Sequence, residues 1–173
     1  QQLQQLTWEQ EQELTGDVTL ALVAVCVLNR WTLHEIVDYY HISENECIRH
    51  LARLDRLKLI ELLPKNRIRL LVAPNFSWIE NGPIQQFFQK KIGQEFFHTG
   101  FNREDESLIV LNGMLSSQSS AELQRKLRRL AREFDALNND DAALDLDERR
   151  GATLVLALRD WRFGLFKPII REM

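Results

Sequence analysis

The sequence predicts an α+β protein, and two observations lead to this class. Between residues 33 and 72, two short capped helices precede two apolar runs that are joined by three turn-forming residues. Further along, apolar runs at 107–115 and 152–158 flank a long amphipathic helix. The expected order is a winged helix-turn-helix followed by a small α/β module of helix, strand, helix and strand.

The helices of the first unit are predicted from their apolar spacing and their caps. Residues 18–29 are almost wholly apolar, which favours a helix buried on most sides. Thr32 is a suitable N-cap for a helix over 33–40, and Ser43, with Glu46 three residues later, has the pattern of a capping box. The helix that begins there directs four apolar side chains inward: Ile48, Leu51, Leu54 and Leu57.

A β-hairpin is predicted after this third helix. Residues 59–63 and 67–72 flank Pro64-Lys65-Asn66, a connection of turn formers. In the second run Arg67 and Arg69 alternate with apolar residues, as in a strand with one exposed face. Three helices followed directly by a hairpin predict a winged helix-turn-helix over residues 17–73.

The second module is expected over residues 83–173. Pro83 stands where a first helical residue is favoured, and Ser119 with Glu122 predicts a second capping box. The long helix that follows has apolar residues at spacings of four and three: Leu123, Leu127, Leu130, Phe134 and Leu137. Because a sheet of only the two strands expected here is marginal, we predict that a second copy of the chain completes it as a homodimer.

Composition limits the remaining possibilities. The 173 residues are 45% hydrophobic and 27% charged, with a net charge of −3 and a pI near 5.9, so any DNA contact must come from a local basic patch. Residues 1–16 are expected as a linker or frayed helix without chemistry. The longest apolar stretch, residues 18–28, is too short to cross a membrane. The two cysteines suggest no disulfide framework and fit the cytoplasm.

Two stretches resemble a known family. The first is WTLHEIVDYYHISENECIRHLARLDRLKLIELLPKNRIRLLVAPNFSWIENGPIQQFF, and the second is REFDALNNDDAALDLDERRGATLVLALRDWRFGLF. Both are similar to the C-terminal part of bacterial XRE-type, phage-repressor-like transcriptional regulators. The resemblance implies a further repressor-type helix-turn-helix upstream. The lack of an initial Met also leads us to expect upstream sequence.

Exposed cations on the third helix and hairpin are the candidate DNA contacts, because a winged helix places this helix in the major groove. The candidates are Asn45, Arg49, His50, Arg53 and Arg56 on the helix, and Lys65, Arg67 and Arg69 on the hairpin. If this region binds duplex DNA, substitution of Arg53 and Arg67 is predicted to weaken binding and its salt dependence.

Two features oppose this prediction. Basic residues outnumber acidic ones by only two between residues 30 and 70, and Glu44 and Glu46 begin the third helix. The alternative is a module that does not bind DNA but mediates protein interaction or senses a ligand for an upstream DNA-binding domain.

The sequence does not indicate an enzyme. We also expect no catalytic residue, cofactor or metal site. The sequence has no P-loop, G-x-S-x-G or G-x-G-x-x-G motif, and His41, Cys47 and His50 have no further ligands at zinc-site spacing. An aromatic set could contact an unknown small-molecule effector, although core packing is the commoner role. Its members are Phe87, Phe88, Phe96, Phe97, Trp161, Phe163 and Phe166.

Overall fold

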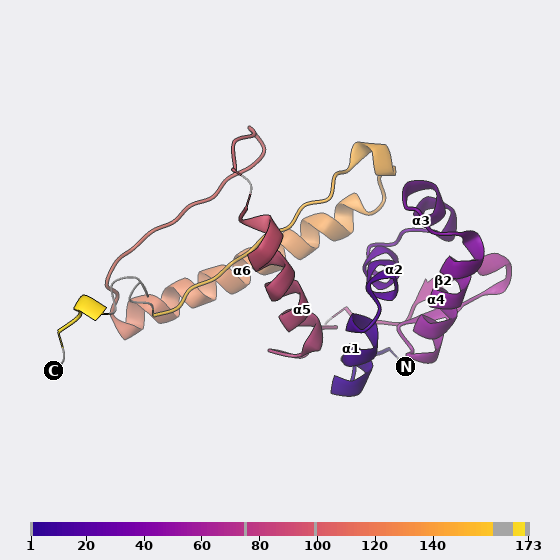
Figure 1. Cartoon of the computed structure of the whole chain (residues 1–173), viewed down its shortest axis with the longest axis horizontal. Coiled ribbons are helices and arrows are strands. Elements are labelled where there is room, and N and C mark those ends of the chain that lie inside the picture. Colours follow the sequence, from indigo (N-terminus) through magenta and orange to yellow (C-terminus); the bar gives the residue numbers. More distant parts are fainter. Residues whose placement is uncertain (1, 75, 99, 161–167, 172–173) are drawn as a thin grey trace. The chain divides into compact units, whose positions relative to one another are not determined.

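The computed structural model describes residues 2–74, 76–98, 100–160 and 168–171. The chain divides into two units, Gln1–Ile109 and Val110–Met173. The described residues form an α+β protein with six α-helices and one two-stranded antiparallel sheet (Figure 1).

The first unit begins with four helices: α1 (Trp8–Thr15), α2 (Val18–Leu28), α3 (Leu33–Tyr39) and α4 (Glu44–Arg56). The last three correspond, in order, to the three helices predicted for the winged helix-turn-helix. Thr32 caps α3 as expected and completes a capping box with Glu35. Ser43 caps α4 by accepting a hydrogen bond from the Glu46 amide at 3.1 Å. The predicted capping box is incomplete, because the Glu46 side chain does not accept a hydrogen bond from the Ser43 amide. The Glu46 carboxylate lies 3.8 Å from His50 instead.

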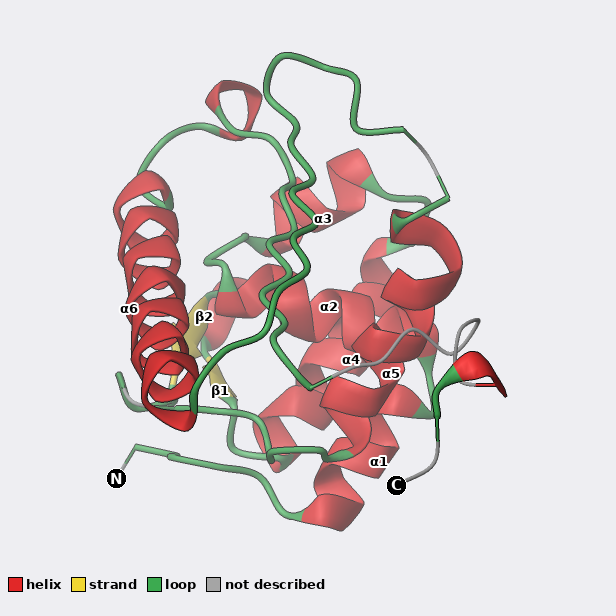
Figure 2. Cartoon of the chain, turned by 90° about the vertical axis from the view of Figure 1, so that its left-hand side faces the viewer, coloured by secondary structure: helices red, strands yellow, loops and turns green. Residues whose placement is uncertain are grey.

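The predicted hairpin follows α4 directly. Strands β1 (Ile60–Leu62) and β2 (Ile68–Leu70) are antiparallel, with Glu61 paired to Arg69 (Figure 2, yellow). The amide of Leu63 donates to the Arg67 carbonyl at 2.8 Å, which closes the connection Pro64–Asn66. Two consecutive residues, Lys65 and Asn66, have φ of 63° and 59°, and this left-handed pair makes the reversal tight.

The core of the first unit lies where α2 meets α4 and the hairpin. Leu20 and Val23 of α2 are fully buried, as are Leu51 and Leu54 of α4. These side chains recur at helical spacing on the faces that the two helices turn toward each other. One face of α4 is thereby committed to the core, and the opposite face remains available.

The N-terminal segment, expected as a linker or frayed helix, contains a capped and packed helix. Leu3 forms a parallel bridge with Val72, where the Leu3 amide donates to the Leu71 carbonyl at 2.7 Å. Thr7 caps α1 in a full capping box with Gln10, and Leu14 is fully buried. Residues 1–16 therefore contain a packed helix, because Leu14 of α1 and Leu6 before it join the same core.

Glu11 connects α1 to helix α5 (Pro83–Lys91), which continues as a π-helical turn at Ile92–Phe96. The fully buried Glu11 carboxylate accepts hydrogen bonds from the Ile79 amide at 2.7 Å and the Ile84 amide at 3.2 Å. A Cβ on Gly82 would lie 2.9 Å from a Glu11 oxygen, so this close approach requires glycine. Helix α5, expected in the second module, thus packs in the first unit.

The described residues of the second unit include a long helix, α6 (Ser117–Asp141), and a short 3₁₀ turn at Leu146–Glu148. Ser116 caps α6 by accepting from the Ser119 amide at 3.1 Å. The predicted cap at Ser119 is therefore wrong: the helix begins three residues earlier, because Ser116 offers the same hydroxyl acceptor.

The two strands predicted for the second module are not formed. Residues 107–115 and 152–158 have no regular secondary structure, and both lie in loop (Figure 2, green). Leu111 is 86% exposed and Met114 100% exposed. A strand needs a neighbour for its amides and carbonyls, and the described residues supply none to these segments. The helix-strand-helix-strand prediction is wrong for these residues.

Candidate nucleic-acid interface

Helix α4 has an outward stripe, which we define as Asn45, Arg49, Ala52 and Arg56. These residues recur at intervals of four, three and four, so they lie on one helix face, and all four are exposed. This face is opposite the buried residues Leu51 and Leu54. Three of the five predicted helix candidates therefore share one solvent-facing surface.

The two guanidinium groups of the outward stripe are not neutralised. Neither Arg49 nor Arg56 forms an ion pair or a side-chain hydrogen bond within the described part of the chain. Ala52 between them is small and leaves the helix backbone open to close approach. Such a surface can bind phosphates or the acceptor edges of guanines.

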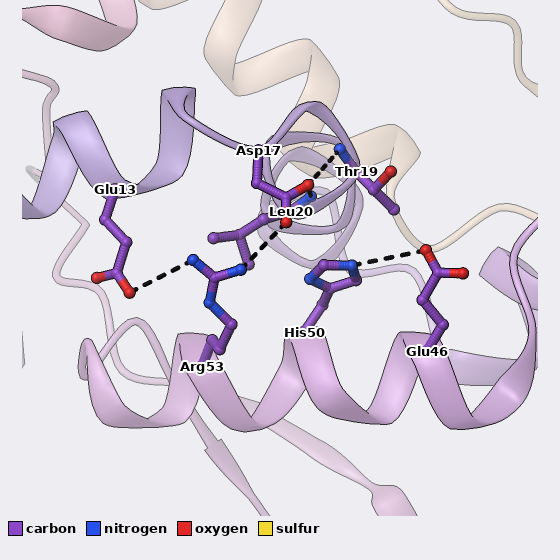
Figure 3. Close-up of polar contacts among 7 residues, drawn as sticks. All are labelled: Glu13, Asp17, Thr19, Leu20, Glu46, His50 and Arg53. Carbon is purple, nitrogen blue, oxygen red and sulfur yellow. Dashed lines mark hydrogen bonds and ion pairs between the residues drawn. The ribbon is translucent and has the colours of Figure 1, made fainter.

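Arg53 belongs to a different face of α4. Its side chain points with those of Glu46 and His50 toward the junction of α1 and α2 (Figure 3). One Arg53 nitrogen lies 3.2 Å from the Asp17 carboxylate and another 3.4 Å from the Glu13 carboxylate. Because two carboxylates already neutralise Arg53, this residue fits a structural role better than the predicted DNA contact.

Asp17 also caps helix α2. Its Oδ1 accepts hydrogen bonds from the amides of Thr19 at 3.1 Å and Leu20 at 3.2 Å. Burial by itself raises the pKa of Asp17, but the Leu20 amide, His50 and the other donors outweigh burial and lower it below 3.8. The ionised carboxylate thus holds the α2 cap and the Arg53 contact together.

His50 is 8% exposed and is not part of the outward stripe. Its Nε2 lies 3.8 Å from Glu46, and its buried Nδ1 has no hydrogen-bond partner among the described residues. An open hollow of about 660 Å³ lies over this part of α4. The hollow is lined by Asp17, Glu46, Arg49, His50, Ala52, Arg53 and Arg56.

The hairpin candidates also differ from one another. Lys65 stands exposed in the connection, and Arg67 is exposed next to it. Neither has an ion pair with any described residue. Arg69, by contrast, contacts Glu61 at 2.7 Å across the sheet. Lys65 and Arg67 therefore remain available to an anionic ligand, whereas Arg69 is neutralised by its cross-strand neighbour.

Sequence reasoning missed Glu13 and Asp17. Asp17 stands directly before the apolar run of α2, so its N-capping role could have been predicted from the sequence. The contacts with Arg53 could not, because they join residues that are 36 and 40 positions apart. They depend on how α1, α2 and α4 pack.

The described residues offer little support for other chemistry. Burial raises the pKa of the Cys26 thiol to about 12 and that of Cys47 to about 11, so neither forms a reactive thiolate near neutral pH. Within the described ranges no three metal-ligating side chains come together, and no helix has the length and apolar character to cross a membrane.

The predicted aromatic set is only partly described. Phe88 and Phe97 are exposed, while Phe87 and Phe96 are partly buried and each contacts the phenylalanine that follows it in the chain. Trp161, Phe163 and Phe166 lie outside the described residues. The small-molecule effector therefore stays a prediction.

No protein-family model matches this chain, and searches of curated proteins and of solved structures give no match either.

Proposed function

We propose that residues 17–73 form a winged helix-turn-helix that binds double-stranded DNA, within the C-terminal region of a transcriptional regulator. The order of elements supports this fold: α2, α3 and α4 precede the β1–β2 hairpin without an intervening domain. In this arrangement α4 enters the major groove and the hairpin approaches the backbone. The resemblance to XRE-type regulators is consistent with the same role.

The outward stripe is the observation that supports DNA binding most directly. Arg49 and Arg56 are exposed, without ion pairs among the described residues, and Asn45 lies on the same face. Arginine binds guanine edges in a bidentate manner, and asparagine does the same with adenine. Lys65 and Arg67 on the hairpin add two cations for phosphate contacts.

The acidic residues at the start of α4 oppose DNA binding less than their number suggests. Glu46 turns toward His50 on the face that meets the α1–α2 junction, so it does not belong to the outward stripe (Figure 3). Glu44 remains exposed in the first turn. The repulsion of phosphate then comes mainly from one carboxylate, against the four available cations.

Duplex binding can be tested by fluorescence anisotropy over a range of salt concentrations. The double variant R49A/R56A is expected to weaken binding because it removes the two proposed guanine contacts. The double variant K65A/R67A is expected to reduce the slope of log K against log salt by about two, since each phosphate contact contributes about 0.9. The variant K90A removes an exposed cation from α5 and serves as the matched control.

The variant R53A distinguishes this proposal from the expectation that Arg53 contacts DNA. Arg53 contacts Glu13 and Asp17, so its loss is expected to lower stability and leave the salt slope unchanged. If R49A/R56A binds duplex DNA with the same affinity as the unmodified chain, the proposed interface is wrong.

A protein-interaction module is the second candidate function. The exposed apolar side chains of the second unit favour it, because patches of this kind mark interaction surfaces. Salt-insensitive or undetectable binding of duplex DNA by the unmodified chain would support this alternative.

A further inference from the structure

Helix α6 has an uneven distribution of charge along its length. Its first half, residues 117–129, contains four cations and one carboxylate, Glu122, whereas its second half, residues 130–141, contains one cation, Arg132, and four carboxylates. The cations are Arg125, Lys126, Arg128, Arg129 and Arg132, and the carboxylates of the second half are Glu133, Asp135, Asp140 and Asp141. The two halves of the helix therefore have opposite net charge.

The same helix has an apolar stripe, which we define as Leu123, Leu127, Leu130, Phe134 and Leu137; Leu127 and Phe134 are partly buried, and the other three are exposed. Spacings of four and three are those of a coiled-coil seam. Leu123, Leu130 and Leu137 are 39%, 44% and 65% exposed. The stripe is about 21 Å long at 1.5 Å per residue, which is long enough for a helix partner.

We propose that α6 pairs with α6 of a second copy of this chain in an antiparallel coiled coil. We identify the partner as a second α6 because the opposite net charges of the two helix halves make the helix complementary to itself. Antiparallel pairing places the basic half of each helix beside the acidic half of the other, whereas parallel pairing would place like charges together. This inference concerns the second unit and does not depend on DNA binding by the first.

The apolar stripe also selects a register. If Leu127 packs opposite the partner's Leu130, then Leu123 packs opposite the partner's Phe134. The flanking position between these two layers is Lys126 on one helix and the partner's Glu133 on the other. Symmetry forms this pair twice, once at each side of the twofold axis.

Lys126 can change its contact at little cost. It now lies 3.6 Å from Glu122 one turn earlier on the same helix, and both side chains are 57% exposed. Exposed pairs of this kind contribute little to stability. In a parallel coiled coil Lys126 would instead face the partner's Ala131, so substitutions at 126 distinguish the two orientations.

Sedimentation equilibrium on the full chain, without DNA, tests this proposal. K126E is expected to raise the dimer dissociation constant about tenfold, because two attractive pairs become repulsive. E133K is expected to have the same effect. The reciprocal variant K126E/E133K restores both pairs with exchanged charges and should restore dimerisation.

R125E is the matched control, because Arg125 is exposed on the side of α6 opposite the apolar stripe. A chain that remains monomeric at all concentrations overturns the proposal. A dissociation constant for K126E equal to that of R125E does so too, as does failure of K126E/E133K to restore dimerisation. Since only dimerisation is measured, failure here is distinct from failure of duplex binding.

Discussion

Replacement of Glu11 is expected to destabilise the first unit more than any substitution of an exposed residue on α1. The Glu11 side chain is fully buried, and its two oxygens accept hydrogen bonds from the backbone amides of Ile79 and Ile84. The Ile84 amide belongs to the first turn of α5, where the helix dipole favours negative charge. Glu11 therefore holds both the connection before α5 and the start of that helix.

The expected loss can be estimated from these two contacts. A hydrogen bond to a charged group contributes about 1.5–3 kcal/mol, and an unpaired buried amide is costly, so E11A should lose about 3–5 kcal/mol of unfolding free energy. E11Q keeps one acceptor oxygen but directs an NH₂ donor at the other amide, so a loss of about 2 kcal/mol is expected.

Urea unfolding followed by tryptophan fluorescence measures these losses. E9A is the matched control, because Glu9 is an exposed carboxylate in the first turn of α1, and its removal should cost less than about 0.5 kcal/mol. Trypsin should also cleave E11A faster at Lys90 and Lys91, since α5 loses its attachment. If E11A loses less than 1 kcal/mol, or no more than E9A, the assigned role of the carboxylate is refuted.

Two further predictions follow from pKa values. Because the folded pKa of Asp17 is lowered below 3.8, its ionised form adds stability that is present above pH ~4 and is lost as pH falls through the lowered value. D17N keeps a good N-cap but removes the charge. In urea unfolding measured from pH 6 to 2.5, the unfolding free energy of D17N should therefore fall less steeply with decreasing pH than that of the unmodified chain, and an equally steep fall contradicts this. With raised pKa values, Cys26 and Cys47 should resist Ellman's reagent at pH 8 in the native protein and react after unfolding, and rapid native labelling would contradict their burial.

The elements that were predicted correctly depend on residues close together in the sequence. Thr32 and Ser43 cap α3 and α4, and Pro64-Lys65-Asn66 forms the hairpin connection, because each of these interactions spans no more than four residues. The exposed face of α4 also follows from helical spacing. Sequence spacing therefore identified Arg49 and Arg56 as candidates, but it could not separate them from Arg53, which is ion-paired with Glu13 and Asp17.

The errors depend on distant residues. Nothing near Glu11 in the sequence indicates that its carboxylate meets the start of α5, 73 residues later. The runs at 107–115 and 152–158 have the apolar pattern of buried strands, but pattern alone does not provide the neighbouring strand whose hydrogen bonds a sheet requires.

The sequence by itself determined helices α2, α3 and α4, the hairpin and the set of cations from which an interface can be drawn, since local spacing and capping specify these features. Only the tertiary structure decided which cations remain available. Arg53 and Arg69 are neutralised by Glu13, Asp17 and Glu61, while Arg49 and Arg56 are not. The reason is physical: the availability of a charge depends on its neighbours in space, and chain packing brings those neighbours from other elements.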